Sequence, residues 1–167
     1  MTTRFRLETF SARNRLLIAD VTLGSGSSFP LHTHDFSELA IVLRGTGTHI
    51  VEGDSLTIRA GDVFVIHGNT EHGFRDPRDL TLCNIMYDPA RYPGFNAEMS
   101  GLPGYHALFQ LEPHFLKRGI FGSRLHLRPD SMRRLAVILD SLRKEFGERR
   151  PGYGSLLSAH FVHLVSH

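Results

Sequence analysis

Short apolar runs, each followed by a glycine-containing turn, make up the first part of the chain. The runs cover residues 16–23, 38–43, 48–52, 55–59, 63–66, 72–76 and 80–87. The turns between them include Gly24-Ser-Gly26, Gly45-Thr-Gly47, Gly53-Asp54 and Gly61-Asp62. Short strands with frequent turns predict a mainly β sandwich or small barrel, and no long helical period interrupts them as a parallel βαβ layout would require.

The pattern changes after residue 87. Residues 88–128 are rich in proline and glycine, which predicts an irregular connection, and its lone histidines, His106 and His114, are expected at the surface. Apolar residues then recur at helical spacing over residues 130–146, with Asp130 as the expected N-cap and Gly147 as the stop. A second helix is expected from Ser155, and it reaches residue 167 without a stop signal.

Composition narrows the class of protein only slightly. The chain has 167 residues and a net charge of +2, with 19 Lys and Arg scattered among 17 Asp and Glu. That length fits one domain with a core, and no basic block predicts a nucleic-acid surface. Cys83 is the single cysteine, so no intrachain disulfide is possible and a small buried residue is expected there. Because neither a signal-peptide h-region nor a membrane-spanning run is present, we expect a cytoplasmic protein.

Four residues carry the candidate chemistry. His32, His34 and Glu38 share one parity, so on a strand their side chains point the same way, and a pairing that brings His72 alongside completes the group. Three imidazoles and a carboxylate suit zinc, nickel, iron or manganese with positions left for water or substrate. The alternative is a hydrogen-bonded polar floor in a metal-free pocket, and both interpretations stay open.

Two motifs around these residues resemble those of the cupin superfamily. Gly26 to Gly45 has the spacing Gly-x5-His-x-His-x3-Glu-x6-Gly, which matches the first cupin signature at every fixed position. The second motif keeps Gly61 and His72, but His67 stands where proline is usual, and Asn69 and Asp76 also depart from the pattern. The resemblance implies a double-stranded β-helix (jelly-roll) barrel with the four ligands in its lumen, followed here by C-terminal helices.

A narrower resemblance covers roughly the first 95 residues. The segments His-Thr-His-Asp-Phe-x-Glu-Leu, Arg-Gly-x-Gly-x-His and Asn-Ile-x-Tyr look like the N-terminal domain of AraC/XylS-family transcription activators, most of all those of rhamnose operons. This resemblance implies an effector-binding domain over residues 1–128 that senses a sugar such as rhamnose, and a helical dimerisation segment over residues 129–167. It also implies operator binding through a C-terminal helix-turn-helix domain that is absent here, so we expect the chain to be part of a longer one. The expected homodimer contacts are Leu135, Leu139, Leu142 and Phe146.

The sensing hypothesis assigns further residues to the pocket. Beside the histidines and Glu38, the expected ligand-binding residues are Arg44, His49, Phe74, Asn84 and Met86. Ligand binding is expected to order an N-terminal arm, residues 1–10, over the barrel mouth. The alternatives are a small metal-dependent enzyme (isomerase, epimerase or dioxygenase) and a carbohydrate-binding protein without chemistry. His160, His163 and His167 share a helix face, but no carboxylate accompanies them and we expect no metal site there.

Overall fold

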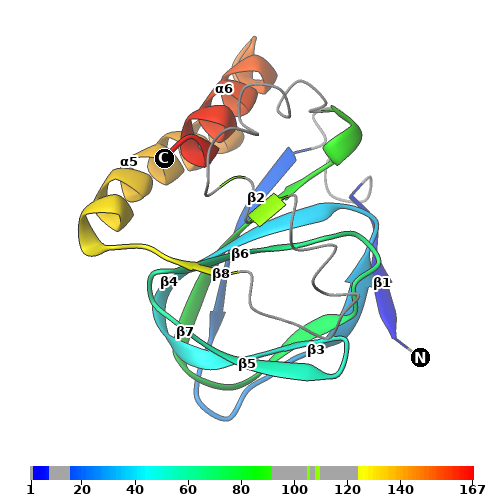
Figure 1. Cartoon of the computed structure of the whole chain (residues 1–167). Coiled ribbons are helices and arrows are strands. Elements are labelled where there is room, and N and C mark those ends of the chain that lie inside the picture. The colour runs from blue at the N-terminus through cyan, green and yellow to red at the C-terminus, as the bar shows by residue number, and fades with distance from the viewer. Residues whose placement is uncertain (1, 8–15, 92–104, 106–107, 110–123) are drawn as a thin grey trace.

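The computed structural model describes residues 2–7, 16–91, 105, 108–109 and 124–167. Within these residues one eight-stranded sheet curls into a barrel, and two helices lie against its outside (Figure 1). The strands are β1 (Thr3–Phe5), β2 (Leu16–Leu23), β3 (Phe29–His34), β4 (Ser37–Val51), β5 (Asp54–Arg59), β6 (Asp62–Ile66), β7 (His72–Tyr87) and β8 (Arg124–His126). A 3-10 helix, η1 (Pro89–Arg91), and the helices α5 (Pro129–Glu148) and α6 (Tyr153–Val165) complete the fold. The predicted mainly β barrel with C-terminal helices is confirmed.

Two long strands organise the barrel. β4 and β7 run antiparallel to each other from Ser37↔Tyr87 to Val51↔His72. β4 also pairs with β6 through its first half and with β5 through its second half, while β7 pairs with β2 and β3. Each long strand was predicted as two shorter strands with a break between them. That break is wrong, because β4 continues through Gly45 and Gly47 and β7 continues through Pro77 while the two strands stay paired.

Gly45 shows why the chain needs glycine inside β4. Its φ is 75°, and a Cβ built there would lie 2.2 Å from the carbonyl oxygen of Asp79 on the neighbouring strand. The register between β4 and β7 shifts between Val42 and Arg44, as at a β-bulge. A one-residue shift reverses the side-chain alternation, so Arg44 is exposed although it shares the parity of Glu38. The expectation that Arg44 faces the pocket is therefore wrong.

Alternation along β4 separates two apolar clusters. Ala40 and Val42 point into the barrel and join a cluster with Phe64 and Leu82. Leu39 and Ile41 point outward and join a second cluster under the helices, which includes these buried residues: Leu16, Ile18, Ile85, Leu135, Leu139, Leu142, Leu157, Phe161 and Leu164. The sheet is thus buried on both faces where α5 and α6 lie against it (Figure 1).

The helices start and stop at other residues than expected. Arg128 is the N-cap of α5 and Pro129 lies in its first turn, where the fixed φ of proline suits a helix and no N–H donor is needed. Arg149, with a φ of 51°, ends α5 in place of Gly147, and Gly152 precedes α6 in place of Ser155. No helix in the described residues has the length and apolar character to cross a bilayer.

The residues assigned to dimerisation lie inside the chain. Leu135, Leu139 and Leu142 are 5%, 0% and 0% exposed, and Phe146 packs partly buried beside them. Leu135, Leu139 and Leu142 pack against the sheet and α6 of the same chain, so these three side chains are not exposed to a second copy. A bidentate ion pair adds to this contact, because the Arg143 guanidinium on α5 donates to both carboxylate oxygens of Asp20 on β2 at 3.1 and 2.9 Å.

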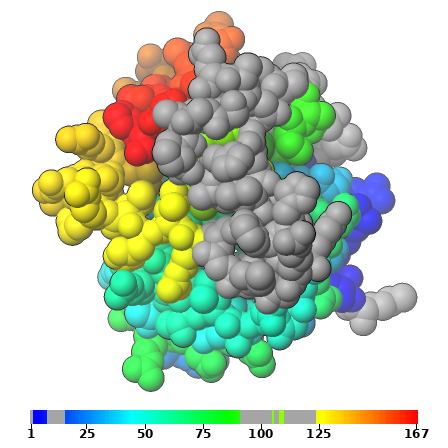
Figure 2. All heavy atoms as spheres, in the orientation of Figure 1, coloured from blue at the N-terminus to red at the C-terminus, as the bar shows by residue number. Residues whose placement is uncertain are grey.

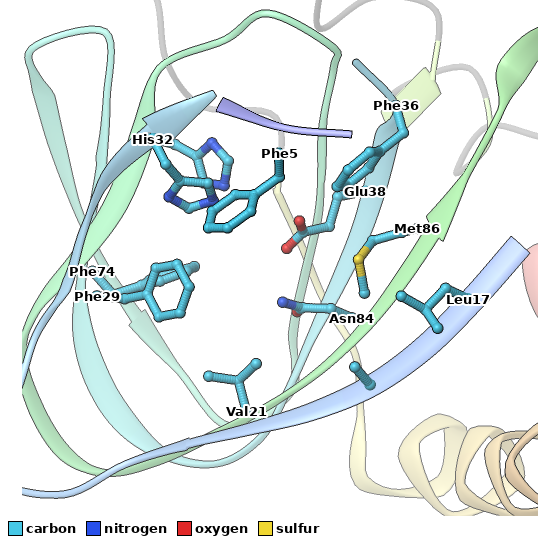
Figure 3. A pocket seen from close by; sticks show the side chains of 12 residues that line it. Phe5, Leu17, Val21, Phe29, His32, Phe36, Glu38, Phe74, Asn84 and Met86 are labelled. Atoms are coloured by element: carbon cyan, nitrogen blue, oxygen red, sulfur yellow. The ribbon is translucent and has the colours of Figure 1, made fainter. Parts of the chain in front are cut away.

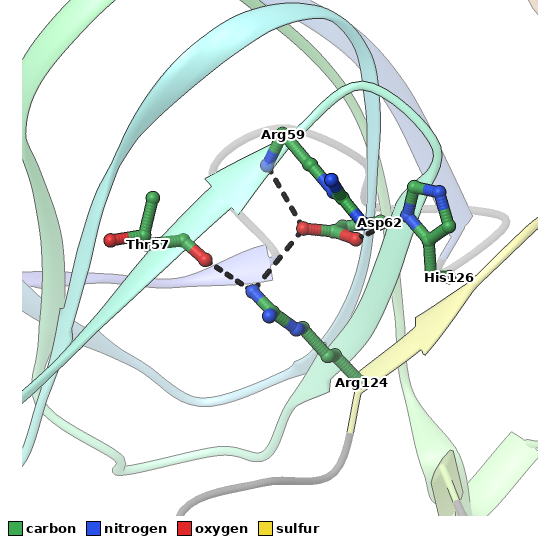
Figure 4. Close-up of polar contacts among 5 residues, drawn as sticks. All are labelled: Thr57, Arg59, Asp62, Arg124 and His126. Atoms are coloured by element: carbon green, nitrogen blue, oxygen red, sulfur yellow. Dashed lines mark hydrogen bonds and ion pairs between the residues drawn. The ribbon is translucent and has the colours of Figure 1, made fainter.

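A buried carboxylate fixes β8 to the barrel. Asp62 is 1% exposed and accepts hydrogen bonds from the Arg59 backbone N–H at 2.9 Å, from Nδ1 of His126 at 2.8 Å and from Arg124 at 3.3 Å. The Arg124 guanidinium also donates to the Thr57 carbonyl (Figure 4). Residues 124–126 were expected in an irregular connection, but this network and pairing with β6 make them a strand. His106 and His114 lie outside the described residues.

Candidate ligand and metal site in the barrel

The barrel brings three histidines and one glutamate together. His32 and His34 come from β3, Glu38 from the start of β4 and His72 from β7. Antiparallel pairing sets His32 directly opposite His72, and the two ring centroids are 4.1 Å apart. The His34 ring lies 5.0 Å from that of His72. All four residues are at most 5% exposed, so the site is shielded from bulk water.

Backbone carbonyls fix the tautomer of each histidine. Nδ1 of His32, His34 and His72 lies 3.0, 2.6 and 3.2 Å from a carbonyl oxygen two residues away along the chain. A carbonyl only accepts, so each Nδ1 donates and carries the proton. The Nε2 atom of each neutral ring is left with a free lone pair, the form in which histidine binds a metal.

Three of the four residues form a compact set of metal ligands. One ligand atom from each of His34, Glu38 and His72 lies within 4.8 Å of the others, the only such group in the part of the chain that the structure describes. Nε2 of His34 and of His72 are buried without a hydrogen-bond partner. Two unpartnered imidazole nitrogens and a neighbouring carboxylate fit a divalent transition metal. The residues present therefore suit the ion that the sequence pattern predicts.

His32 stands apart from this set. Its ring meets Phe5 and Phe29 edge-on, with centroid distances of 5.1 and 5.0 Å. These two contacts and the Nδ1 hydrogen bond hold the ring against the cavity wall. His32 was predicted as a fourth ligand, but it is not in the group of residues whose ligand atoms lie within 4.8 Å of one another.

Burial shifts each of these side chains toward its uncharged form. Desolvation raises the pKa of Glu38 to about 7, and no cation offsets it. Desolvation lowers the pKa of His34 to about 4 and that of His72 to about 2, and it also lowers the pKa of His32. Because these histidines are neutral, they offer lone pairs and not positive charge. A divalent ion would bind in exchange for the proton of Glu38.

A cavity of about 230 Å³ opens beside the ligand set. Figure 3 shows the side chains of His32, Glu38 and Asn84 directed into it. Its wall is otherwise apolar and aromatic, and the full lining is Phe5, Leu17, Ala19, Val21, Phe29, His32, Phe36, Glu38, His72, Phe74, Asn84 and Met86. A mostly apolar cavity with a few convergent polar groups is the usual form of a small-molecule site.

The predicted ligand-binding residues divide into two groups. Phe74, Asn84 and Met86 line the cavity, and Oδ1 of Asn84 is buried without a hydrogen-bond partner. His49 lies behind the wall, its ring stacked on those of Phe64 and Phe74 at 4.7 and 4.9 Å. Arg44 is exposed, as described above.

Sequence reasoning missed the wall that β2 provides. Leu17, Ala19 and Val21 face the cavity, whereas Leu16 and Ile18 join the cluster under the helices. The alternation of residues 16–23 indicated two faces, but it did not indicate which one meets the ligand. Pairing with β7, which sets Ala19 opposite Asn84, decides this.

The N-terminal strand closes one side of the cavity. β1 pairs in parallel with β3, with Phe5 opposite His34. Leu7 is buried, and its backbone N–H donates to Oδ1 of Asp35 at 2.9 Å. Residues 2–7 of the predicted arm therefore lie against the barrel, while residues 1 and 8–10 fall outside the described part.

Comparison with known proteins agrees with this geometry. Residues 19–85 match the Cupin_2 family, described as "Cupin domain". The HTH-type transcriptional activators RhaR of Escherichia coli K12 and Shigella flexneri serotype 5b are 42% identical over 80 residues, which is 47% of this chain and 28% of theirs. The aligned segment thus spans less than a third of the length of these relatives.

Solved structures also align with part of the chain. KdgF from Halomonas sp. is 22% identical, covers 45% of this chain and 70% of its own, and aligns with a TM-score of 0.43. An RmlC-like cupin from Shewanella frigidimarina is 25% identical, covers 48% and 72% of the two chains, and has a TM-score of 0.43. The family match and the paired histidine strands together assign residues 19–85, in the N-terminal region of this chain, to the cupin family.

Proposed function

We propose that this chain is the effector-sensing domain of an AraC-family transcription activator and that its barrel cavity binds a sugar such as rhamnose. The observation that carries the proposal is the 42% identity over 80 residues to HTH-type transcriptional activators of the rhamnose type. A regulator of that kind is cytoplasmic, acts as a homodimer and reaches operator DNA through a further domain.

The cavity offers the chemistry that a deoxysugar requires. Hydroxyl groups need several oriented polar partners, which Glu38, His32, His72 and the Asn84 amide supply around one part of the wall. Phe29, Phe74 and the β2 side chains give the apolar surface for ring and methyl carbons. A volume of about 230 Å³ admits one monosaccharide.

A divalent metal is part of this proposal. His34, Glu38 and His72 would hold the ion, and when bound it would act as a Lewis acid toward a ligand hydroxyl. Asn84 accepts a hydrogen bond from a second hydroxyl through its buried Oδ1. The aromatic residues exclude water and so strengthen both polar contacts.

Calorimetric titration of this chain tests the sensing function. We expect L-rhamnose to bind more tightly than galactose or arabinose, with one site per chain. Asn84→Leu removes the amide at nearly constant volume and should weaken binding about tenfold, the cost of one buried hydrogen bond. Asp54→Asn, in the exposed β4–β5 turn, is the matched control. If no monosaccharide binds at millimolar concentration, with or without added zinc, the proposal is wrong.

A metal-dependent enzyme is the second candidate, and the compact His34, Glu38 and His72 group favours it. The metal-loaded protein should then interconvert or oxidise one member of the same sugar panel, which NMR of the sugar carbons detects. Binding without turnover supports the sensor, and turnover that chelator abolishes supports the enzyme.

A further inference from the structure

Two histidines at the end of α6 lie unusually close together. Nε2 of His163 and Nε2 of His167 are 3.1 Å apart, and the ring centroids are 4.9 Å apart. The chain keeps a helical turn beyond α6, because the Ser166 N–H donates to the Val162 carbonyl at 3.0 Å. This turn places residue 167 one turn above residue 163 on the same face.

The separation of the two nitrogens matches that of neighbouring ligands on one ion. Imidazole nitrogens bind divalent transition metals at about 2.0–2.1 Å, so two of them 3.1 Å apart subtend roughly 98° at a shared ion. That angle is close to the 90° of square-planar and octahedral ions. A tetrahedral ion would need a separation of about 3.3–3.4 Å.

We propose, against the expectation from the sequence that no metal site forms on this helix, that His163 and His167 form a two-nitrogen surface site for Cu²⁺ or Ni²⁺, distinct from the barrel site. The remaining positions on the ion are open to water or to an external ligand. Binding needs the tautomer with Nδ1 protonated in both rings, so the proton in the Nε2–Nε2 hydrogen bond moves to Nδ1 of its own ring and both Nε2 lone pairs become available to the ion. The proposal does not depend on the sensing function, because both residues lie on the helical segment outside the barrel, where the C-terminal end reaches the surface (Figure 2).

The surroundings fix the helical turn that carries both rings. The neighbouring Leu164 is 4% exposed and anchors this turn of α6 in the core. On the other side, His167 borders a small hollow with Ser131, Arg134 and Leu135 of α5. Arg134 is the one charged residue lining that hollow in the described part of the chain, and no carboxylate lines it. The protein therefore offers the ion only imidazole nitrogens and no carboxylate oxygen. This ligand set favours Cu²⁺ over harder cations, which prefer oxygen ligands.

Copper titration of a His34→Ala background, which disables the barrel site, tests the inference. Electron paramagnetic resonance should show two coordinated nitrogens, with affinity in the order Cu²⁺, Ni²⁺, Zn²⁺ of decreasing strength. His163→Ala and His167→Ala should each weaken Cu²⁺ binding about a hundredfold through loss of chelation. His160→Ala, on the preceding turn, is the matched control and should leave it unchanged.

Both test residues are exposed, so the variants should fold, and circular dichroism verifies this. A spectrum with one coordinated nitrogen, or equal Cu²⁺ affinity in wild type and in both variants, overturns the assignment. A third nitrogen that disappears in His160→Ala also overturns it, because the site would then have three ligands.

Discussion

Nε2 of His34 lies 3.7 Å from the nearer carboxylate oxygen of Glu38, and both side chains are buried in the barrel. This distance is too long for a hydrogen bond, so neither atom satisfies the other. Burial favours the neutral form of each residue. A divalent ion placed between them would use the lone pair of His34 and the carboxylate of Glu38 at once.

Metal stoichiometry should follow the three-residue group. The test uses a His163→Ala background, which removes the surface site. In it, His34→Ala or His72→Ala should abolish binding of one equivalent of zinc per chain. His32→Ala should lower the zinc affinity but leave the stoichiometry at one zinc per chain. Atomic emission after dialysis measures the metal content, with His160→Ala as the control. Unchanged stoichiometry in His34→Ala would reject the site.

The stability of the metal-free protein should fall in acid. His34, His49 and His72 have a folded-state pKa of about 4, 3 and 2, below the ordinary 6.5, mainly through desolvation. Below pH 6.5 the unfolded chain binds protons that the folded chain does not, which destabilises the fold. Between pH 7 and pH 5 each histidine contributes a loss of about 2 kcal/mol to the free energy of unfolding. Urea unfolding at a series of pH values, in the presence of a chelator, measures this change in the free energy of unfolding.

Glu38 should act in the opposite direction. Its pKa is raised from 4.5 to about 7, so its contribution to stability is present at low pH and is lost as pH rises from 4.5 to 7. It offsets about 2 kcal/mol of the acid-induced loss. Glu38→Gln should therefore steepen the decrease in stability between pH 7 and pH 5. A shallower decrease in this variant would contradict the assigned direction.

Asp62 should stabilise the attachment of β8. Asp62→Asn weakens the bonds to Arg124 and His126 and should lower the free energy of unfolding by about 2 kcal/mol or more. Hydrogen exchange of the backbone amides of residues 124–126 should also be faster in the Asp62→Asn variant than in the wild type. The exposed Asp54→Asn serves as the control, and equal exchange in both variants would show that the network does not hold β8.

Leu139 should behave as a core residue of one chain. It is 0% exposed, so Leu139→Ala should cost about 2–5 kcal/mol of stability. Val137, two residues away on α5, is 68% exposed, and Val137→Ala should change stability by less than about 0.5 kcal/mol. Because the contact is intramolecular, the Leu139→Ala loss should not vary with protein concentration. A concentration-dependent loss would return Leu139 to a dimer interface.

The N-terminal strand should report ligand binding. Phe5 lines the cavity, so a bound sugar gains a contact there only while β1 stays paired with β3. Rhamnose should then slow tryptic cleavage after the exposed Arg6 and leave cleavage after Arg149 unchanged. The protection should disappear in Phe5→Ala, and unchanged cleavage in wild type would remove the arm from the sensing mechanism.

The sequence determined the local features. Side-chain direction repeats every two residues on a strand, so the parity of His32, His34 and Glu38 already placed them on one face. Helical spacing of Leu135, Leu139 and Leu142 determined that α5 has an apolar stripe. These properties depend only on neighbours along the chain.

Tertiary structure decided which segments of the chain pack against each other. A register shift within β4 turned Arg44 outward, and pairing across the barrel gave β2 the cavity wall. The same stripe of α5 suits a second copy or its own sheet, and only packing within the chain selected the sheet. His32 lies beside the ligand set because Phe5 and Phe29, distant from each other in sequence, hold its ring. Such choices rest on contacts between remote segments, whose register the periodicity of a single segment does not encode.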